Sequence, residues 1–147
     1  MYDLSLSQIK GLIEDESDLI SNLSNVAAVL KENHGFFWVG FYIVKNGQLV
    51  LGPFQGPVAC TRIEKGKGVC GAAWTEKQSI LVGNVHEFPG HIACNGKSKS
   101  EVVVPLFDKS GEVTMVFDVD HDEFDFFDLK DKENLEKIAG MISEIHG

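Results

Sequence analysis

The sequence predicts an α+β domain, in which helices at the two ends of the chain cover one face of a central antiparallel sheet. Two observations lead to this prediction. Apolar residues recur at three- and four-residue spacings near both termini, as amphipathic helices require. The middle of the chain instead alternates β-branched and aromatic residues, in runs that short turn sequences join. The second face of such a sheet is free to carry a pocket beneath the connecting loops.

The whole chain, residues 1–147, is expected to form one domain, because 147 residues is an ordinary domain length. Its formal net charge of −9 at pH 7 argues against nucleic acid or an anionic membrane as a partner. The first residues lack the basic and apolar segments of a signal peptide, and no apolar stretch is long enough to cross a membrane. We therefore expect a cytoplasmic protein with its cysteines reduced at rest.

Helical patterns occupy residues 1–35 and the segment that begins at Asp128. The first pattern loosens near residues 14–17, which indicates two helices, and Gly35 offers a natural helix end. The apolar positions of these helices are Ile9, Leu12, Ile13, Leu19, Ile20, Leu23, Val26, Ala27 and Leu30, and then Leu135, Ile138, Ile142 and Ile145.

Strand patterns fill most of the region between these helices. Alternation along Phe36–Val44 predicts that one face of this strand carries Phe36, Trp38, Gly40 and Tyr42. The pair Asn46-Gly47 that follows is a strong hairpin signal. The other expected elements are a strand at Gln48–Phe54, a short helix at Gly68–Glu76, a strand at Ser79–Val85, and a hairpin of Glu101–Phe107 with Glu112–Val119.

Three cysteines, Cys60, Cys70 and Cys94, lie in glycine-marked segments, and an odd number suits redox chemistry better than a disulfide framework. For any one of them the alternative is a buried structural cysteine. His86, His91 and Cys94 are zinc-type ligands close in sequence, but no CxxC pair accompanies them. We therefore expect no metal and favour a thiol oxidoreductase, whose cysteines cycle between thiol, sulfenic acid and disulfide.

Three acidic residues are expected to meet on one sheet face. Asp118 and Asp120 alternate along one strand, so their side chains point the same way, and Glu101 begins the neighbouring strand of the hairpin. Clustered carboxyl groups raise one another's pKa, so that one of them can stay protonated and serve as a general acid. The alternative is a solvated polar face, which antiparallel sheets often have.

Two further features suit a small ligand. Trp38 shares its strand face with Tyr42, and an indole there would hold an apolar group such as a methyl, although a core role is the alternative. The glycines at 66, 68 and 71 match neither the Walker nor the dinucleotide fingerprint. Their backbone N–H groups could still bind a carboxylate.

Taken together, these segments resemble the free methionine-(R)-sulfoxide reductases, which are single GAF-domain enzymes. The shared motifs are WVGFY at Trp38–Tyr42, LGPFQGPVAC at Leu51–Cys60, GKGVCGAAW at Gly66–Trp74, NVHEFPGHIAC at Asn84–Cys94, SEVVVPL at Ser100–Leu106 and FDVD at Phe117–Asp120. The resemblance implies a single GAF domain, with a central antiparallel sheet, terminal helices on one face and the substrate pocket under loops on the other.

The resemblance also implies a reaction, the thiol-dependent reduction of free methionine-(R)-sulfoxide. Cys94 would attack the sulfoxide sulfur and be left as a sulfenic acid, with Glu101 or Asp120 protonating the departing oxygen. Cys60 would then form the disulfide, with Cys70 as the alternative or a relay, and thioredoxin would reduce it. No metal or organic cofactor is needed.

The resemblance implies five substrate contacts: Trp38, Tyr42, Glu101, Asp118 and Asp120. Trp38 would pack against the methyl group, and Asp118 would either support the network of carboxyl groups or bind the substrate's ammonium group. A homodimer is also implied. Two other readings compete. A non-catalytic GAF sensor of small ligands is the main alternative, and a thiol peroxidase would use the same cysteines on a peroxide.

Overall fold

A computed structural model of the chain describes residues 1–91 and 96–147. The elements of the described part are α1 (Tyr2–Ile13), α2 (Leu19–His34), β1 (Trp38–Lys45), β2 (Gln48–Gln55), β3 (Arg62–Glu64), α3 (Gly68–Glu76), β4 (Ile80–Val82), the 3₁₀ turn η1 (Val85–Glu87), β5 (Ser100–Phe107), β6 (Val113–His121) and α4 (Leu129–His146). The strands form one sheet in the order β3-β2-β1-β6-β5-β4, and every neighbouring pair is antiparallel. The predicted α+β architecture is therefore confirmed.

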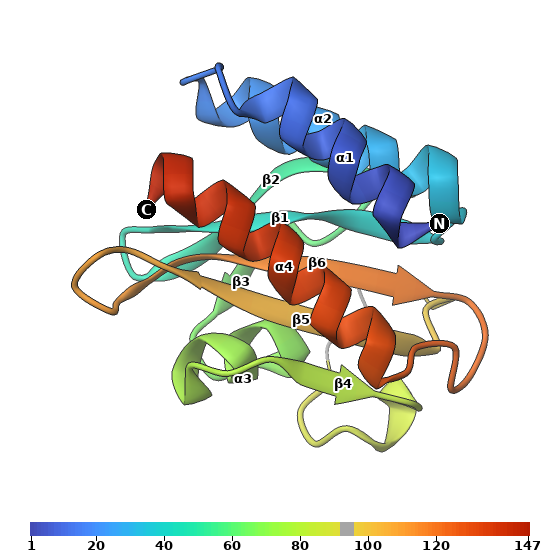
Figure 1. Ribbon diagram of the computed structural model, residues 1–147. Helices are drawn as coiled ribbons and strands as arrows, with labels where there is room; N and C mark the ends of the chain where they lie inside the picture. The colour runs from blue at the N-terminus through green and yellow to red at the C-terminus, as the bar shows by residue number, and fades with distance from the viewer. Residues whose placement is uncertain (92–95) are drawn as a thin grey trace.

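The sheet carries a different apolar layer on each of its faces. α1, α2 and α4 lie together on one face, where they bury the larger core with the inward residues of β1, β5 and β6 (Figure 1). α3 packs on the opposite face, where Val69 and Trp74 join a second cluster with Trp38 and Tyr42 of β1. This second face is the one the sequence predicted to be free for a pocket.

The predicted helix end at Gly35 and the helix start near Asp128 are confirmed, whereas the cap at Asp18 was not predicted. Asp18 caps α2 by accepting a 2.8 Å hydrogen bond from the Ser21 backbone N–H, and Gly35 ends the helix with a φ of +64°. Asp128 and Asp131 form a capping box at the start of α4. Two positions of the predicted apolar stripe are wrong, because Leu12 is 45% exposed and Ile20 is 53% exposed.

The strand predictions need three corrections. Phe36 belongs to the helix-side core, whereas Phe37 borders the pocket, because β1 begins only at Trp38 and the pleat does not extend back to them. The expected strand at Ser79–Val85 is shorter, since β4 spans Ile80–Val82. The short edge strand β3 was missed, because three residues carry too little periodicity to be recognised.

An aromatic cluster anchors the end of the sheet that leads into the β6–α4 connection. His121 stacks on Phe126 with ring centroids 3.7 Å apart, and Phe126 packs edge-on against Phe127. The Phe37 backbone N–H donates to Nδ1 of His121 at 3.3 Å. The cluster therefore fixes the ends of β1 and β6, where Trp38 and Asp120 lie.

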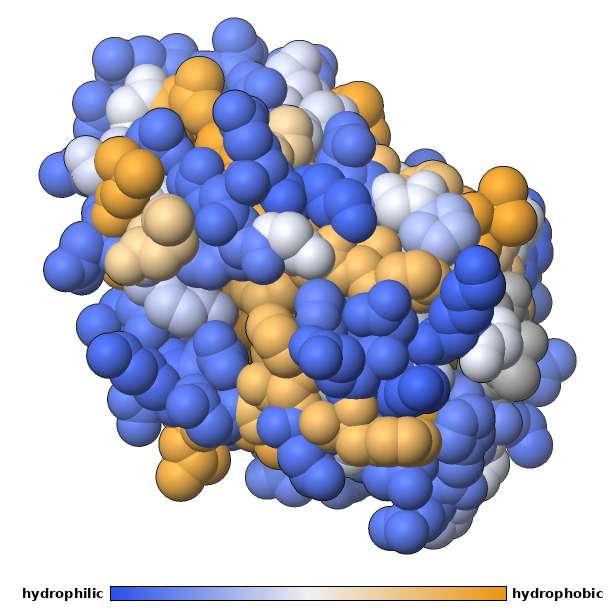
Figure 2. Space-filling model, turned by 90° about the vertical axis from the view of Figure 1, so that its right-hand side faces the viewer, coloured by the Kyte–Doolittle hydropathy of each residue, from blue (hydrophilic) through white to orange (hydrophobic). Residues whose placement is uncertain are grey.

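The connection between β6 and α4, at the right of Figure 1, lies on the side of the molecule that faces the viewer in Figure 2. Apolar surface gathers there among hydrophilic groups. Phe124, Phe126 and Leu129 are exposed large apolar residues of this stretch.

Within the described residues, no helix combines the length and the apolar character that a membrane crossing requires.

Candidate active site

A cavity of about 70 Å³ lies on the sheet face that carries α3, and it has room for several water-sized groups. Strands β1, β5 and β6, the start of α3 and the loop after β2 surround it. The side chains that the sequence singled out converge on this cavity: Trp38, Tyr42, Cys70, Glu101, Asp118 and Asp120.

The strand register explains why the acids meet. Glu101 of β5 lies directly opposite Asp120 of β6, and Trp38 of β1 lies opposite Asp120 on the other side. Asp118 is two residues before Asp120 and therefore shares its face. The predicted cluster is thus confirmed as an arrangement, but the predicted alternative of a solvated face is wrong. Glu101, Asp118 and Asp120 are only 6%, 6% and 7% exposed.

Burial is the first cause that raises the pKa of all three carboxyl groups. The pKa of Glu101 is well above its usual value because of burial first and then the charges of Asp118 and Asp120. The pKa of Asp120 is also well raised, by burial first and then by Asp118. The pKa of Asp118 is raised by burial, but hydrogen bonds with Glu101, Asp120 and Cys70 oppose that rise. Asp118 is therefore the acceptor of the cluster, and its two neighbours keep their protons to a higher pH than exposed carboxyl groups would.

Asp118 also keeps one oxygen for a ligand. Its Oδ1 is buried and finds no hydrogen-bond donor among the described residues. A buried polar atom without a partner is costly, so this oxygen suits a place where a water, an ion or another molecule binds. A cationic or hydrogen-donating group of a ligand would satisfy this oxygen.

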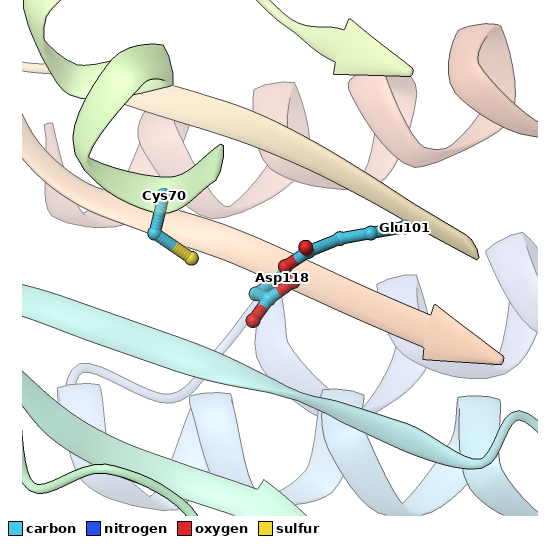
Figure 3. A group of neighbouring side chains, drawn as sticks. All are labelled: Cys70, Glu101 and Asp118. Carbon is cyan, nitrogen blue, oxygen red and sulfur yellow. The ribbon is translucent and has the colours of Figure 1, made fainter. Parts of the chain in front are cut away.

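Cys70 approaches the same cluster from α3. Figure 3 shows its sulfur directed toward the carboxyl groups of Glu101 and Asp118, and the three ligand atoms lie within 4.8 Å of one another. In the described part of the chain, this trio is the group with the types and spacing of a metal site. Burial, followed by the charge of Asp118, raises the pKa of the Cys70 thiol well above its usual value. A metal would have to displace that proton, which opposes binding.

The other two cysteines are placed differently. Cys60 is half-buried in the loop after β2 and is disulfide-bonded, whereas Cys70 is a free, buried thiol. Cys94, the predicted nucleophile, lies outside the described residues. His91, three residues before Cys94, borders the cavity, and burial is the first cause that lowers the pKa of its imidazole.

The indole of Trp38 forms one wall of the cavity and is held on several sides. It stacks between Tyr42, at a centroid distance of 6.0 Å, and Phe54, at 5.2 Å. Its Nε1 donates to the carbonyl of Pro57 at 3.0 Å. Gly40 lies beneath the ring, and a Cβ there would come within 2.8 Å of the indole Cη2 and 2.9 Å of the Phe54 Cα. The absence of a side chain at Gly40 is what lets the indole lie flat.

We expect Gly40→Ala to destabilise the protein by about 2 kcal/mol or more, because the new methyl meets backbone that cannot move aside. Urea unfolding measures this. Gly140→Ala is the matched control, since Gly140 lies in α4 with nothing within 4 Å of its Cβ position, and alanine there should be neutral or stabilising. A Gly40→Ala protein as stable as the wild type would contradict this account of the Trp38 wall.

Sequence reasoning missed Lys67, which borders the cavity at the start of α3 beside Gly68 and Val69. The Gly68 N–H donates to the Gly90 carbonyl at 3.1 Å, but the next N–H groups of α3 have no intrahelical acceptor, so this wall favours an anionic group. The glycine-rich sequence was a usable signal. Gly66 and Gly68 have φ values of +80° and +63°, and a Cβ on Gly71 would lie 2.8 Å from the Glu64 carbonyl.

The sequence and the fold match those of known proteins. The sequence profile of the GAF domain family matches residues 14–145. The chain is 51% identical to GAF domain-containing protein A of Dictyostelium discoideum over 142 residues, which cover 96% of this chain and 89% of that protein.

It is 40% identical to the free methionine-R-sulfoxide reductase of Saccharomyces cerevisiae over 147 residues, which cover 95% of this chain and 82% of that one. An X-ray structure of the free methionine-R-sulfoxide reductase of Neisseria meningitidis in complex with its substrate matches with a TM-score of 0.95 and 47% identity. That match covers 98% of this chain and 87% of the other. The chain therefore belongs to the GAF domain family, in the branch that contains the free methionine-R-sulfoxide reductases.

Proposed function

We propose that this protein reduces free methionine-(R)-sulfoxide to methionine. The observation that carries the proposal is the buried group of three carboxyls opposite Trp38, in a chain whose relatives are named as reductases of that substrate. A cavity with an acidic floor and an indole wall suits a molecule that carries an ammonium group, a sulfoxide oxygen and a methyl group.

The chemistry begins with Cys94. Its thiol sulfur attacks the sulfoxide sulfur and forms an S–S bond, while an acid protonates the sulfoxide oxygen, which leaves as water. A water molecule then attacks the Cys94 sulfur, the S–S bond breaks, and methionine departs with Cys94 left as a sulfenic acid. Methionine sulfoxide is thereby reduced to methionine by two electrons, and Cys94 is oxidised by two. No cofactor takes part in this step.

Glu101 and Asp120 are the proton donors that this step requires. Both keep their protons because burial and Asp118 raise their pKa values, and Glu101 is crowded by two acids. A buried acid that stays protonated near neutral pH can donate at the moment negative charge develops on the oxygen. We assign the donation to Glu101, with Asp120 passing its proton within the network.

Recognition of the free amino acid follows from charge at both ends of the cavity. Asp118 Oδ1 accepts from the ammonium, while Lys67 and the start of α3 face the carboxylate. Trp38 and the ring of Tyr42 enclose the methyl group. A methionine sulfoxide within a peptide has neither charge and would leave these buried groups unpaired. Each unpaired group costs about 1–3 kcal/mol in binding free energy, so the peptide form is strongly disfavoured.

The cycle closes through Cys60. Its thiol attacks the Cys94 sulfenic acid, a disulfide forms and the oxygen leaves as water. Cys60 is half-buried and follows Val58, which is 82% exposed, so this segment is open to a reducing partner such as thioredoxin. Cys70 is less suited to this role, because its thiol is buried and its raised pKa keeps it from forming a thiolate.

The experiment that tests the function is methionine release, measured by chromatography, from the separated R and S forms of free methionine sulfoxide with dithiothreitol as reductant. We expect turnover of the R form alone. A blocked derivative, N-acetyl-methionine-(R)-sulfoxide, serves as the control for charge recognition and should not turn over. No release from either free form would reject the proposal and favour a ligand-binding GAF sensor.

A further inference from the structure

We propose that Tyr42 is a positioning residue for the disulfide-forming step, in which its hydroxyl holds the Cys60 peptide at the edge of the cavity. This inference rests on the proposed function and assigns Tyr42 a role in recycling in addition to its ring's place in the cavity wall.

The contact that carries the inference is a hydrogen bond from the Tyr42 hydroxyl to the Cys60 carbonyl, 2.8 Å long. It joins the middle of β1 to a loop residue 18 positions along the chain. Tyr42 is 3% exposed, so water does not easily replace it as the donor to this carbonyl. The hydroxyl proton therefore points at the backbone of Cys60, the cysteine proposed to form the disulfide with Cys94. It does not point at the carboxyl groups of the cavity.

The loop of residues 56–61 depends on β1 at a second point. The Nε1 of Trp38 donates to the Pro57 carbonyl at 3.0 Å, and Gly56, with a φ of +142°, lets the backbone pass close to the indole. A Cβ at Gly56 would lie 2.7 Å from Trp38 Cδ1. Two aromatic side chains of one strand face thus hold this loop at its two ends, near Pro57 and at Cys60.

Such a clamp matters for the rate of disulfide formation. The loop lies between β2 and β3 without strand or helix structure of its own, and its Val58 side chain is 82% exposed. In the reduced protein, where the disulfide bond of Cys60 no longer holds the loop, loss of the Tyr42 contact would let the Cys60 thiol sample more positions. A condensation between two groups on one chain is fast only when both are held in reacting geometry, and a displacement of 1 Å can cost about 10²-fold in rate.

The test is Tyr42→Phe, which keeps the ring in the cavity wall and removes only the hydroxyl. Reduced protein is mixed with one equivalent of free methionine-(R)-sulfoxide, and two events are timed in the same samples. Methionine is measured by chromatography, and free thiols and dimedone-trapped sulfenic acid are measured by mass spectrometry. The readout is the ratio of the two rates: we expect disulfide formation to slow about tenfold more than methionine release does, so that sulfenic acid accumulates.

The matched control is Tyr2→Phe, because Tyr2 and Tyr42 are the two tyrosines of the chain. The Tyr2 hydroxyl also makes a part-buried hydrogen bond, 2.7 Å to Asp131, but on the helix side of the sheet. Both variants lose one tyrosine hydroxyl bond, so a general effect on stability would appear in both. Only Tyr42→Phe should slow disulfide formation.

A second measurement separates recycling from substrate reduction. Concentrated dithiothreitol reduces the sulfenic acid directly, so the thioredoxin-driven turnover of Tyr42→Phe, relative to wild type, should fall about tenfold further than its turnover with dithiothreitol does. Disulfide formation at the wild-type rate would overturn the inference, and so would an equal slowing of methionine release. If the wild-type protein itself releases no methionine, the proposed function fails and the tyrosine variant has no bearing on that result.

Discussion

Replacing Cys94 by serine should abolish methionine formation with every reductant, whereas replacing Cys60 by serine should leave one methionine per chain when no reductant is present. A serine hydroxyl cannot attack sulfur or carry the oxygen away, so the first step has no substitute. Without Cys60 the first step still occurs, but the sulfenic acid has no partner and the chain stops after one turnover.

The measurement is methionine released per mole of reduced protein, first without reductant and then with thioredoxin and its reductase. Cys60→Ser should regain turnover with dithiothreitol but not with thioredoxin. The same two assays on Cys70→Ser test the alternative that Cys70 forms the disulfide with Cys94. In that case Cys70→Ser, and not Cys60→Ser, would stop after one turnover. Sustained thioredoxin-driven turnover by Cys94→Ser would reject Cys94 as the nucleophile.

The arrangement of the acids was predictable from the sequence because strands impose a strict period. Asp118 and Asp120 had to share a face, and a short turn between β5 and β6 brought Glu101 beside them. Their burial was not predictable, because it depends on α3, which closes over the same face from a distant part of the chain. The sequence pattern of alternating polar residues is the same whether a sheet face is exposed to solvent or covered by a helix.

The hydrogen bonds of the aromatic residues show a second limit. The pattern WVGFY indicates that Trp38 and Tyr42 share a face, but nothing in it says that their polar atoms reach Pro57 and Cys60. These contacts depend on how β2 and the following loop turn back over β1. The error at Phe36 has a similar origin, since alternation predicts faces only where the pleat has begun.

Replacing Glu101 by glutamine should lower turnover on the order of 10²-fold and at the same time stabilise the fold. The loss follows because an amide has the size of the acid but no acidic proton that it can transfer to the sulfoxide oxygen. The gain follows because a buried acid among two others, with its pKa well raised, is costly whenever it ionises. Glu133→Gln, on the exposed side of α4, is the control and should change neither quantity.

The stability gained by Glu101→Gln should depend on pH, and the raised pKa of Glu101 predicts in which direction. The native state holds the Glu101 proton more tightly than the unfolded chain, whose glutamate pKa is about 4.5. Its contribution to stability is therefore fully present below about pH 4 and is lost as the pH rises through the raised native pKa. The difference in melting temperature between Glu101→Gln and wild type should consequently grow from pH 4 to pH 8.

Only this difference is informative, because other carboxyl groups act in the opposite direction. Hydrogen bonds from the backbone are the first cause that lowers the pKa of Asp18 and of Asp128 at the helix starts, so these caps lose stability as the pH falls. Subtracting the wild-type curve removes their common contribution.

A difference that stays constant with pH would show that Glu101 titrates normally, and a variant with unchanged turnover would move the proton donor to Asp120. A protein that becomes more stable and less active by one change would show that the acid cluster is kept for its chemistry at the expense of the fold.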